Sequence, residues 1–176
     1  MNAADDITAL AATVSQALAA AGIEAVLSGG AAVQIYSDAA YVSKDLDFVT
    51  AAGHRELRSV LATLGFKPGR SRRLFESADS AYLVEFPAWP LAVGDELVRS
   101  WACLRTQYGD LQILTPTQSV KDRLAAFYHW KDRQALLQAV CITRQQDNVD
   151  LAEIERWSKA EQSATGFETF KKHLEQ

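Results

Sequence analysis

The sequence predicts an α+β fold: a small mixed β-sheet with flanking helices, followed by a C-terminal helical lobe. Up to about residue 114, segments with helical spacing of apolar residues alternate with short β-type runs. Beyond that point only helical segments follow. With 176 residues, 48% hydrophobic and 23% charged, the chain has the composition of a globular protein with a real core. We therefore expect a core domain over residues 1–114 and a helical lobe over residues 115–176 that packs on it.

The expected elements follow from turn residues and periodicity. Gly22 and Gly65 end two helices, Pro87 and Pro90 end a strand, and Thr115 followed by Pro116 begins the helical lobe. In order, the core is expected to hold a helix over 4–21, a strand over 23–27, a helix over 31–36, a strand over 44–49, a helix over 54–64, strands within 66–77 and 80–87, and a hairpin over 101–114. The lobe is expected to be helical over 115–142, 150–162 and 167–176.

Charge and composition narrow the class of protein. The formal net charge is -4 and the sequence pI about 5.4, so a polynucleotide partner would need a local basic patch. No run approaches the roughly 18 apolar residues of a membrane helix, and the N-terminus lacks the basic stretch of a signal peptide. We expect a cytoplasmic protein with no membrane partner. Cys103 and Cys141 lie in apolar surroundings without metal-site spacing, which predicts two buried thiols.

Two aspartates on one strand carry the first chemical signal. Asp45 and Asp47 are two positions apart, so both side chains leave the same face, roughly 6 to 7 Å apart at the Cα atoms. Leu46 and Phe48 take the opposite, buried face. Two carboxylates this close repel each other, and a divalent cation between them removes the cost. Mg²⁺ acts in this way in sites that also hold substrate phosphates.

A turn and a third carboxylate extend this pattern. Ser28, Gly29 and Gly30 form a small-residue turn at the start of a predicted helix, where backbone N–H groups and the helix dipole favour polyphosphate. Glu85, between apolar neighbours in a strand, is expected to face a cleft. Together the parts predict Mg²⁺-assisted phosphoryl or nucleotidyl transfer.

The segments SGGAAVQIY, KDLDF and LVEF together resemble the motif set of the DNA polymerase β-type nucleotidyltransferase superfamily. The closer resemblance is to small stand-alone bacterial members, including the AbiEii and MenT-type toxin nucleotidyltransferases and their uncharacterised relatives. The resemblance implies that Asp45, Asp47 and Glu85 bind Mg²⁺, or Mn²⁺ in its place, and are catalytic. It also implies that the nucleotide is bound by Ser28, Gly29, Gly30, Lys121 and Asp132.

The geometry of Lys121 and Asp132 leaves two alternatives open. On one continuous helix they share a face but lie ~16 Å apart, so they would touch different parts of an extended substrate. If the helix instead breaks near His129 and Trp130, the two side chains come together. Asp122, about 100° around the helix from Lys121, is expected to be the solvated neighbour.

The implied function is transfer of a nucleoside monophosphate from an NTP to the hydroxyl of an unknown acceptor. In its sharpest form the acceptor is tRNA and the protein is a toxin paired with an antitoxin protein. The alternative is a non-catalytic module of the same fold that binds nucleotide or a partner protein. The basic run with Arg70, Arg72 and Arg73 is either a solvated hairpin loop or a patch that grips triphosphate or an RNA backbone.

Overall fold

A computed structural model describes residues 3–176 and confirms the α+β fold with a mixed sheet and a C-terminal helical region. The helices are α1 (Ala3–Ala20), α2 (Gly29–Tyr36), α3 (His54–Thr63), α4 (Pro116–Trp130), α5 (Arg133–Gln145), α6 (Leu151–Ala160) and α7 (Ala164–Leu174). The strands are β1 (Ala25–Ser28), β2 (Asp45–Thr50), β3 (Lys67–Pro68), β4 (Leu74–Glu76), β5 (Leu83–Glu85), β6 (Ala92–Val93), β7 (Glu96–Leu97), β8 (Ala102–Thr106) and β9 (Gly109–Ile113).

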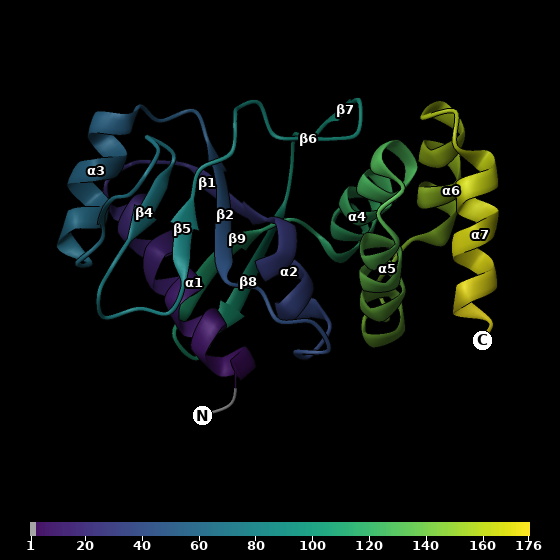
Figure 1. Cartoon of the computed structure of the whole chain (residues 1–176), viewed down its shortest axis with the longest axis horizontal. Coiled ribbons are helices and arrows are strands. Elements are labelled where there is room, and N and C mark those ends of the chain that lie inside the picture. The colour runs from purple at the N-terminus through teal and green to yellow at the C-terminus, as the bar shows by residue number, and fades with distance from the viewer. Residues whose placement is uncertain (1–2) are drawn as a thin grey trace.

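Seven strands form one mixed sheet in the order β3-β4-β5-β2-β1-β9-β8. At its centre β2 pairs antiparallel with β1 and parallel with β5. A separate hairpin of β6 and β7 lies above α4 at the top of Figure 1. The central position of β1, β2 and β5 brings the three sequence motifs onto neighbouring strands.

The two faces of the sheet differ because successive side chains of a strand alternate between them. Leu27, Leu46, Phe48 and Val84 point to one face and belong to the main core, which also contains apolar side chains of α1, α2 and α3. The opposite face carries a small second cluster of Val26, Val49, Leu91 and Leu114. Asp45, Asp47 and Glu85 alternate with the main-core residues of their strands, so they lie on this second face.

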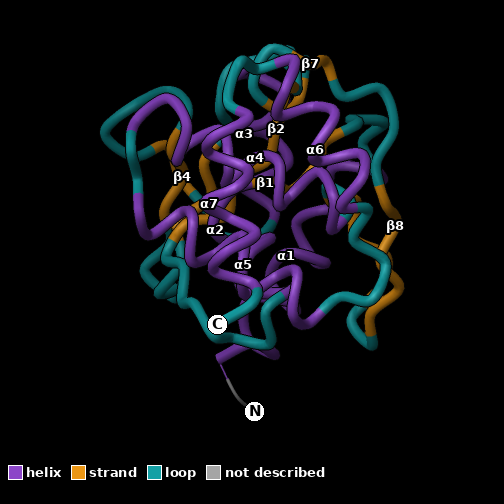
Figure 2. The backbone as a smooth tube through the Cα atoms, turned by 90° about the vertical axis from the view of Figure 1, so that its right-hand side faces the viewer, coloured by secondary structure: helices purple, strands orange, loops and turns teal. Residues whose placement is uncertain are grey.

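The helical lobe begins at a strong cap. The hydroxyl of Thr115 accepts a hydrogen bond from the Gln118 backbone N–H at 3.1 Å, and Pro116 occupies the first turn, where no N–H is needed. The lobe stacks α4 to α7 beside the sheet, in the foreground of Figure 2. Within residues 3–176 no helix has the length and apolarity needed to span a membrane.

The structure corrects several expected elements. The segment 66–77 is a short hairpin of β3 and β4, and 115–142 is two helices, because Lys131 adopts a left-handed conformation that ends α4. The hairpin of β6 and β7 was missed. Cys103 is exposed and Cys141 partly exposed, so the prediction of two buried thiols was wrong. The edge strand β8 turns Ala102 and Leu104 toward the core and Cys103 toward solvent.

Candidate active site

A pocket of about 360 Å³ opens on the second face of the sheet. The strands contribute Ser28, Asp47 and Glu85, the start of α2 contributes Gly29, and α4 contributes Asp122 and Arg123. The segment after β5, including Pro87 and Leu91, forms a further wall. Three motifs that are far apart in the sequence therefore meet in one cavity, together with one helix of the lobe.

Asp47 and Glu85 are direct neighbours in the pocket. They are register partners on the parallel strands β2 and β5, which lie roughly 4.8 Å apart. The pKa of Asp47 is raised to about 6, first by burial and then by the negative charges of Glu85 and Asp45, whereas Arg123 opposes the shift. Two carboxylates at this distance repel each other when no cation is bound. This repulsion is the expected property of carboxylates that hold a metal ion.

The donor set fits a magnesium ion that is shared with a substrate. Asp45 is two residues before Asp47 on the same face, yet it does not line the pocket. Within residues 3–176 no three His, Cys, Asp or Glu side chains converge into a complete metal site. Mg²⁺ is usually held by one or two carboxylates together with substrate phosphates and water, so Asp47 and Glu85 suffice as protein ligands.

The diglycine turn approaches Asp47 very closely. Gly29 has a φ of +63°, and a Cβ atom there would lie 2.2 Å from Oδ2 of Asp47. Ser28 donates a hydrogen bond from its hydroxyl to the backbone oxygen of Asp47 at 3.2 Å, and its side chain does not cap α2. Gly30, the second residue of α2, does not line the pocket. The start of α2 thus faces the carboxylates without a side-chain cap.

Arg123 was not predicted as a pocket residue, and Asp122, which was expected to be solvated, instead lines the pocket and pairs with Arg123. The guanidinium of Arg123 donates to the Asp122 carboxylate, with Nε at 3.0 Å from Oδ2. Burial alone would lower the pKa of Arg123, but Asp122, Asp47 and Asp132 outweigh it and raise the pKa above its usual value. Arg123 therefore remains a fixed cation inside an acidic pocket. The feature of the sequence that could have indicated Arg123 as a site residue is its position directly after Lys121 and Asp122.

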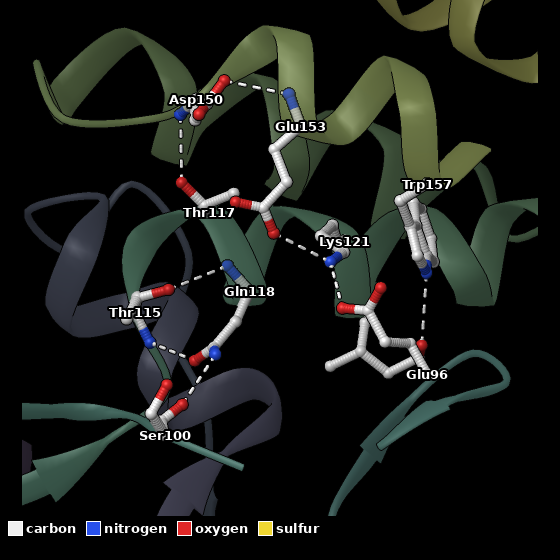
Figure 3. A network of polar contacts seen from close by, with 10 residues as sticks. Glu96, Ser100, Thr115, Thr117, Gln118, Lys121, Asp150, Glu153 and Trp157 are labelled. Carbon is white, nitrogen blue, oxygen red and sulfur yellow. Dashed lines mark hydrogen bonds and ion pairs between the residues drawn. The ribbon is translucent and has the colours of Figure 1, made fainter. Parts of the chain in front are cut away.

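Lys121 does not reach this pocket. Its side chain is 1% exposed, and its Nζ donates to Glu96 of β7 at 2.5 Å and to Glu153 of α6 at 3.0 Å (Figure 3). The amine also lies 5.6 Å from the centre of the Trp157 ring, whose indole N–H donates to the Val93 backbone oxygen. These contacts tie the β6–β7 hairpin to the lobe. The nucleotide-binding role implied by resemblance remains a prediction, and the contacts favour a structural one.

Asp132 lies at the break between α4 and α5, and this break directly follows Trp130, where the second alternative expects it. Its carboxylate accepts hydrogen bonds from the backbone N–H groups of Gln134 and Ala135, at 2.9 and 3.1 Å, and so caps α5. It is not a wall of the pocket, and its charge acts on Arg123. The break does not pair Asp132 with Lys121, whose partners are glutamates.

The contacts of Lys121 predict the outcome of removing its charge. Lys121→Met should lower the free energy of unfolding by about 1 to 2 kcal/mol, because two carboxylates lose their cation. Affinity for a magnesium–NTP complex should stay unchanged. Lys159→Met is the matched control, because Lys159 forms a solvent-exposed pair with Glu155 and its removal should leave the stability nearly unchanged. Denaturant unfolding and calorimetry measure both quantities. A large loss of NTP affinity with intact stability would restore the nucleotide-binding role.

The three arginines of the basic run do not all lie in the same place. Arg72 and Arg73 line a second pocket of about 300 Å³, which shares Pro87 and Ala88 with the first. Arg70, in the same loop, is exposed and lines neither pocket.

No protein-family model and no curated protein matches the chain. The solved structures that are similar to it include the following three. The solution structure of the antibiotic-resistance factor ANT(2'')-Ia has a TM-score of 0.60 at 14% identity, with 98% of this chain and 99% of that chain covered. The crystal structure of ANT(2'')-Ia in complex with adenylyl-2''-tobramycin has a TM-score of 0.55 at 16% identity, covering 90% and 98%.

The third is an antigenic nucleotidyltransferase-like protein from Paracoccidioides brasiliensis, with a TM-score of 0.54 at 14% identity and coverage of 91% and 92%. At these identities the similarity establishes the fold. The chain therefore has the fold of nucleotidyltransferases, as its motifs predict, while its resemblance to the toxin members stays a prediction.

Proposed function

We propose that the protein is a Mg²⁺-dependent nucleotidyltransferase that moves a nucleoside monophosphate from an NTP to a hydroxyl group. The observation that carries the proposal is the register pairing of Asp47 with Glu85 in a pocket that also contains the diglycine turn. Asp47 and Glu85 would hold the metal, with Asp45 adding negative charge from the same strand. Mn²⁺ would serve in its place. The bound ion would offset the charge on the triphosphate.

Other groups of the chain bind the phosphates, accept the proton and stabilise the leaving group. Backbone N–H groups after Ser28, at Gly29 and Gly30, hold the β- and γ-phosphates. The acceptor oxygen bonds to the α-phosphorus, the bond from that phosphorus to the bridging oxygen breaks, and pyrophosphate leaves with the electron pair. The Glu85 carboxylate takes the hydroxyl proton. Arg123 stabilises the charge on the departing pyrophosphate.

The reaction is tested by incubating the protein with each ribonucleoside triphosphate, labelled at the α-phosphate, and with RNA or metabolite pools. Wild-type protein should transfer label in the presence of Mg²⁺ or Mn²⁺. Glu85→Gln keeps the size of the side chain but removes its charge, and should reduce transfer at least about 100-fold. Transfer by Glu85→Gln at the wild-type rate would contradict the assigned chemistry.

A finer proposal concerns the acceptor. The resemblance to AbiEii and MenT-type proteins supports tRNA as the acceptor and an antitoxin as the protein partner. Expression should then arrest growth, a neighbouring small gene should relieve the arrest, and label should appear in tRNA. Normal growth together with labelled metabolites would reject this version and leave the nucleotidyl transfer intact.

The second candidate function is a non-catalytic module that binds nucleotide or a partner protein. The observation in its favour is that no three metal-binding side chains converge within residues 3–176. Titration with magnesium–NTP separates the two candidates. Binding by the wild-type protein without label transfer to any pool would favour the module, whereas transfer that Asp45→Ala or Asp47→Ala abolishes would favour the enzyme.

A further inference from the structure

The second pocket has a charge opposite to that of the candidate active site. Its walls carry Arg72, Arg73 and His54, and no Asp or Glu lines it. Both arginines are exposed, and within residues 3–176 neither forms an ion pair. In a chain with a formal net charge of -4, two unpaired guanidinium groups at one pocket provide a local site for an anion.

The pocket is held in place by contacts within its walls. The ring of His54 lies 5.7 Å from the Phe75 ring in a stacked arrangement, and its Nδ1 donates to the backbone oxygen of Arg72 at 2.7 Å. The Arg73 backbone oxygen accepts a hydrogen bond from the Phe86 N–H at 2.8 Å. The loop with the arginines is thus attached both to the start of α3 and to the segment between the two pockets.

An aromatic side chain completes the pocket. Trp89 lines it and is 49% exposed, so about half of its surface is accessible to a ligand. Arginines that bind phosphate beside an exposed aromatic ring are the combination with which proteins hold nucleotides. The short side chains of Ala51, Ala52 and Ala88 leave room for a planar ring in the same pocket.

The position of the pocket connects it to the reaction. Thr50, at the far end of β2, lines the second pocket, and Asp47, three residues earlier, lines the first. Three residues of a strand span roughly 10 Å. A molecule whose phosphate binds at the arginines can therefore extend along Pro87 and Ala88, which both pockets share, and present a hydroxyl to the carboxylates.

We propose that this second pocket is the acceptor site and that the acceptor carries a phosphate beside a ring that stacks on Trp89. The inference rests on the proposed nucleotidyl transfer and names its acceptor class as a nucleotide, either free or at the end of an RNA strand. Tobramycin, whose adenylylated form is bound by ANT(2'')-Ia, carries amines that these arginines would repel.

The test uses the full chain and the double variant Arg72→Glu/Arg73→Glu. The probes are a short fluorescent oligoribonucleotide, a ribonucleoside monophosphate as its competitor, and a non-hydrolysable magnesium–NTP analogue. The double variant should bind the oligoribonucleotide at least about tenfold more weakly. Trp89→Ala should weaken binding about tenfold through the lost stacking. Both variants should bind the NTP analogue as the wild type does.

Arg70→Glu is the matched control, because it reverses a charge in the same loop outside the pocket. Equal weakening by Arg70→Glu and by the double variant, or no oligoribonucleotide binding by wild-type protein, would overturn the inference. An equal loss of NTP-analogue affinity in the double variant would also overturn it, since the pocket would then belong to the NTP.

Competition by the monophosphate shows whether the bound phosphate belongs to a free nucleotide or to the end of an RNA strand. Effective competition by the monophosphate supports a free nucleotide acceptor, and weak competition supports the end of a strand. Failure of the wild type to bind the NTP analogue would reject the proposed function. Selective loss of oligoribonucleotide binding in the double variant would still support the phosphate site.

Discussion

Asp47→Asn should abolish nucleotidyl transfer and at the same time stabilise the metal-free protein. Transfer should fall at least about 100-fold, because the substitution removes charge from one of the two carboxylates that are proposed to hold the metal ion. Stability at pH 7 should rise by on the order of 1 kcal/mol, since Asn relieves the repulsion from Glu85 and Asp45 and the cost of burying a charge. Thermal unfolding in the presence of a chelator, combined with the label-transfer assay, measures both effects.

The stabilisation should depend on pH. The pKa of Asp47 rises from an ordinary value of 3.8 to about 6 in the folded protein, so the folded state binds the proton more tightly than the unfolded state. Wild-type stability is therefore lost as pH rises from about 4 through 6. The advantage of Asp47→Asn should be full at pH 7 and vanish below about pH 4.

Magnesium should reduce the advantage, because a cation between the carboxylates offsets their repulsion. An Asp47→Asn variant that is less stable than wild type at pH 7 without metal would contradict this description of the pocket.

Gly29→Ala should impair transfer far more than it impairs folding. A methyl group at residue 29 would lie 2.2 Å from Oδ2 and 3.1 Å from Cγ of Asp47, so the carboxylate must move away from its present position. Transfer should fall at least about tenfold, because a displaced ligand costs positioning. The positive φ of +63° adds a conformational cost of about 1 to 2 kcal/mol for any residue with a Cβ.

Gly22→Ala isolates the second of these effects. Gly22 has a φ of +73°, and nothing within 4 Å would contact an added Cβ. The two variants should lose similar stability in chemical denaturation, while only Gly29→Ala should lose transfer. Equal transfer rates in both variants would show that the close approach of Gly29 to Asp47 has no part in the chemistry.

The strand motifs could be predicted because their signals are local. Asp45 and Asp47 alternate with Leu46 and Phe48, and this alternation alone determines which side chains leave the core. Which strands become neighbours is decided by long-range pairing. The adjacency of Asp47 and Glu85 required the parallel pairing of β2 with β5, which resemblance implied and spacing alone could not provide.

The residues on α4 were harder to predict. Helical spacing places Lys121, Asp122 and Arg123 around 200° of one helix, and the sequence does not show which side faces the sheet. Packing against α6 and β7 turns Lys121 toward Glu153 and Glu96, and thereby turns Arg123 to the pocket. The hairpin that supplies Glu96 has strands of only two residues each, too short for a periodic signal.

The nucleotidyl transfer proposed for this protein requires that the pocket between the diglycine turn and the Asp47–Glu85 pair bind an NTP together with a divalent cation. Calorimetric titration with a non-hydrolysable NTP analogue, with and without Mg²⁺, tests it most directly in the wild type and in Asp47→Asn/Glu85→Gln. The wild type should bind the analogue only in the presence of Mg²⁺, and the double variant should show no Mg²⁺-dependent binding. Equal affinity in both proteins, unaffected by Mg²⁺, would contradict it.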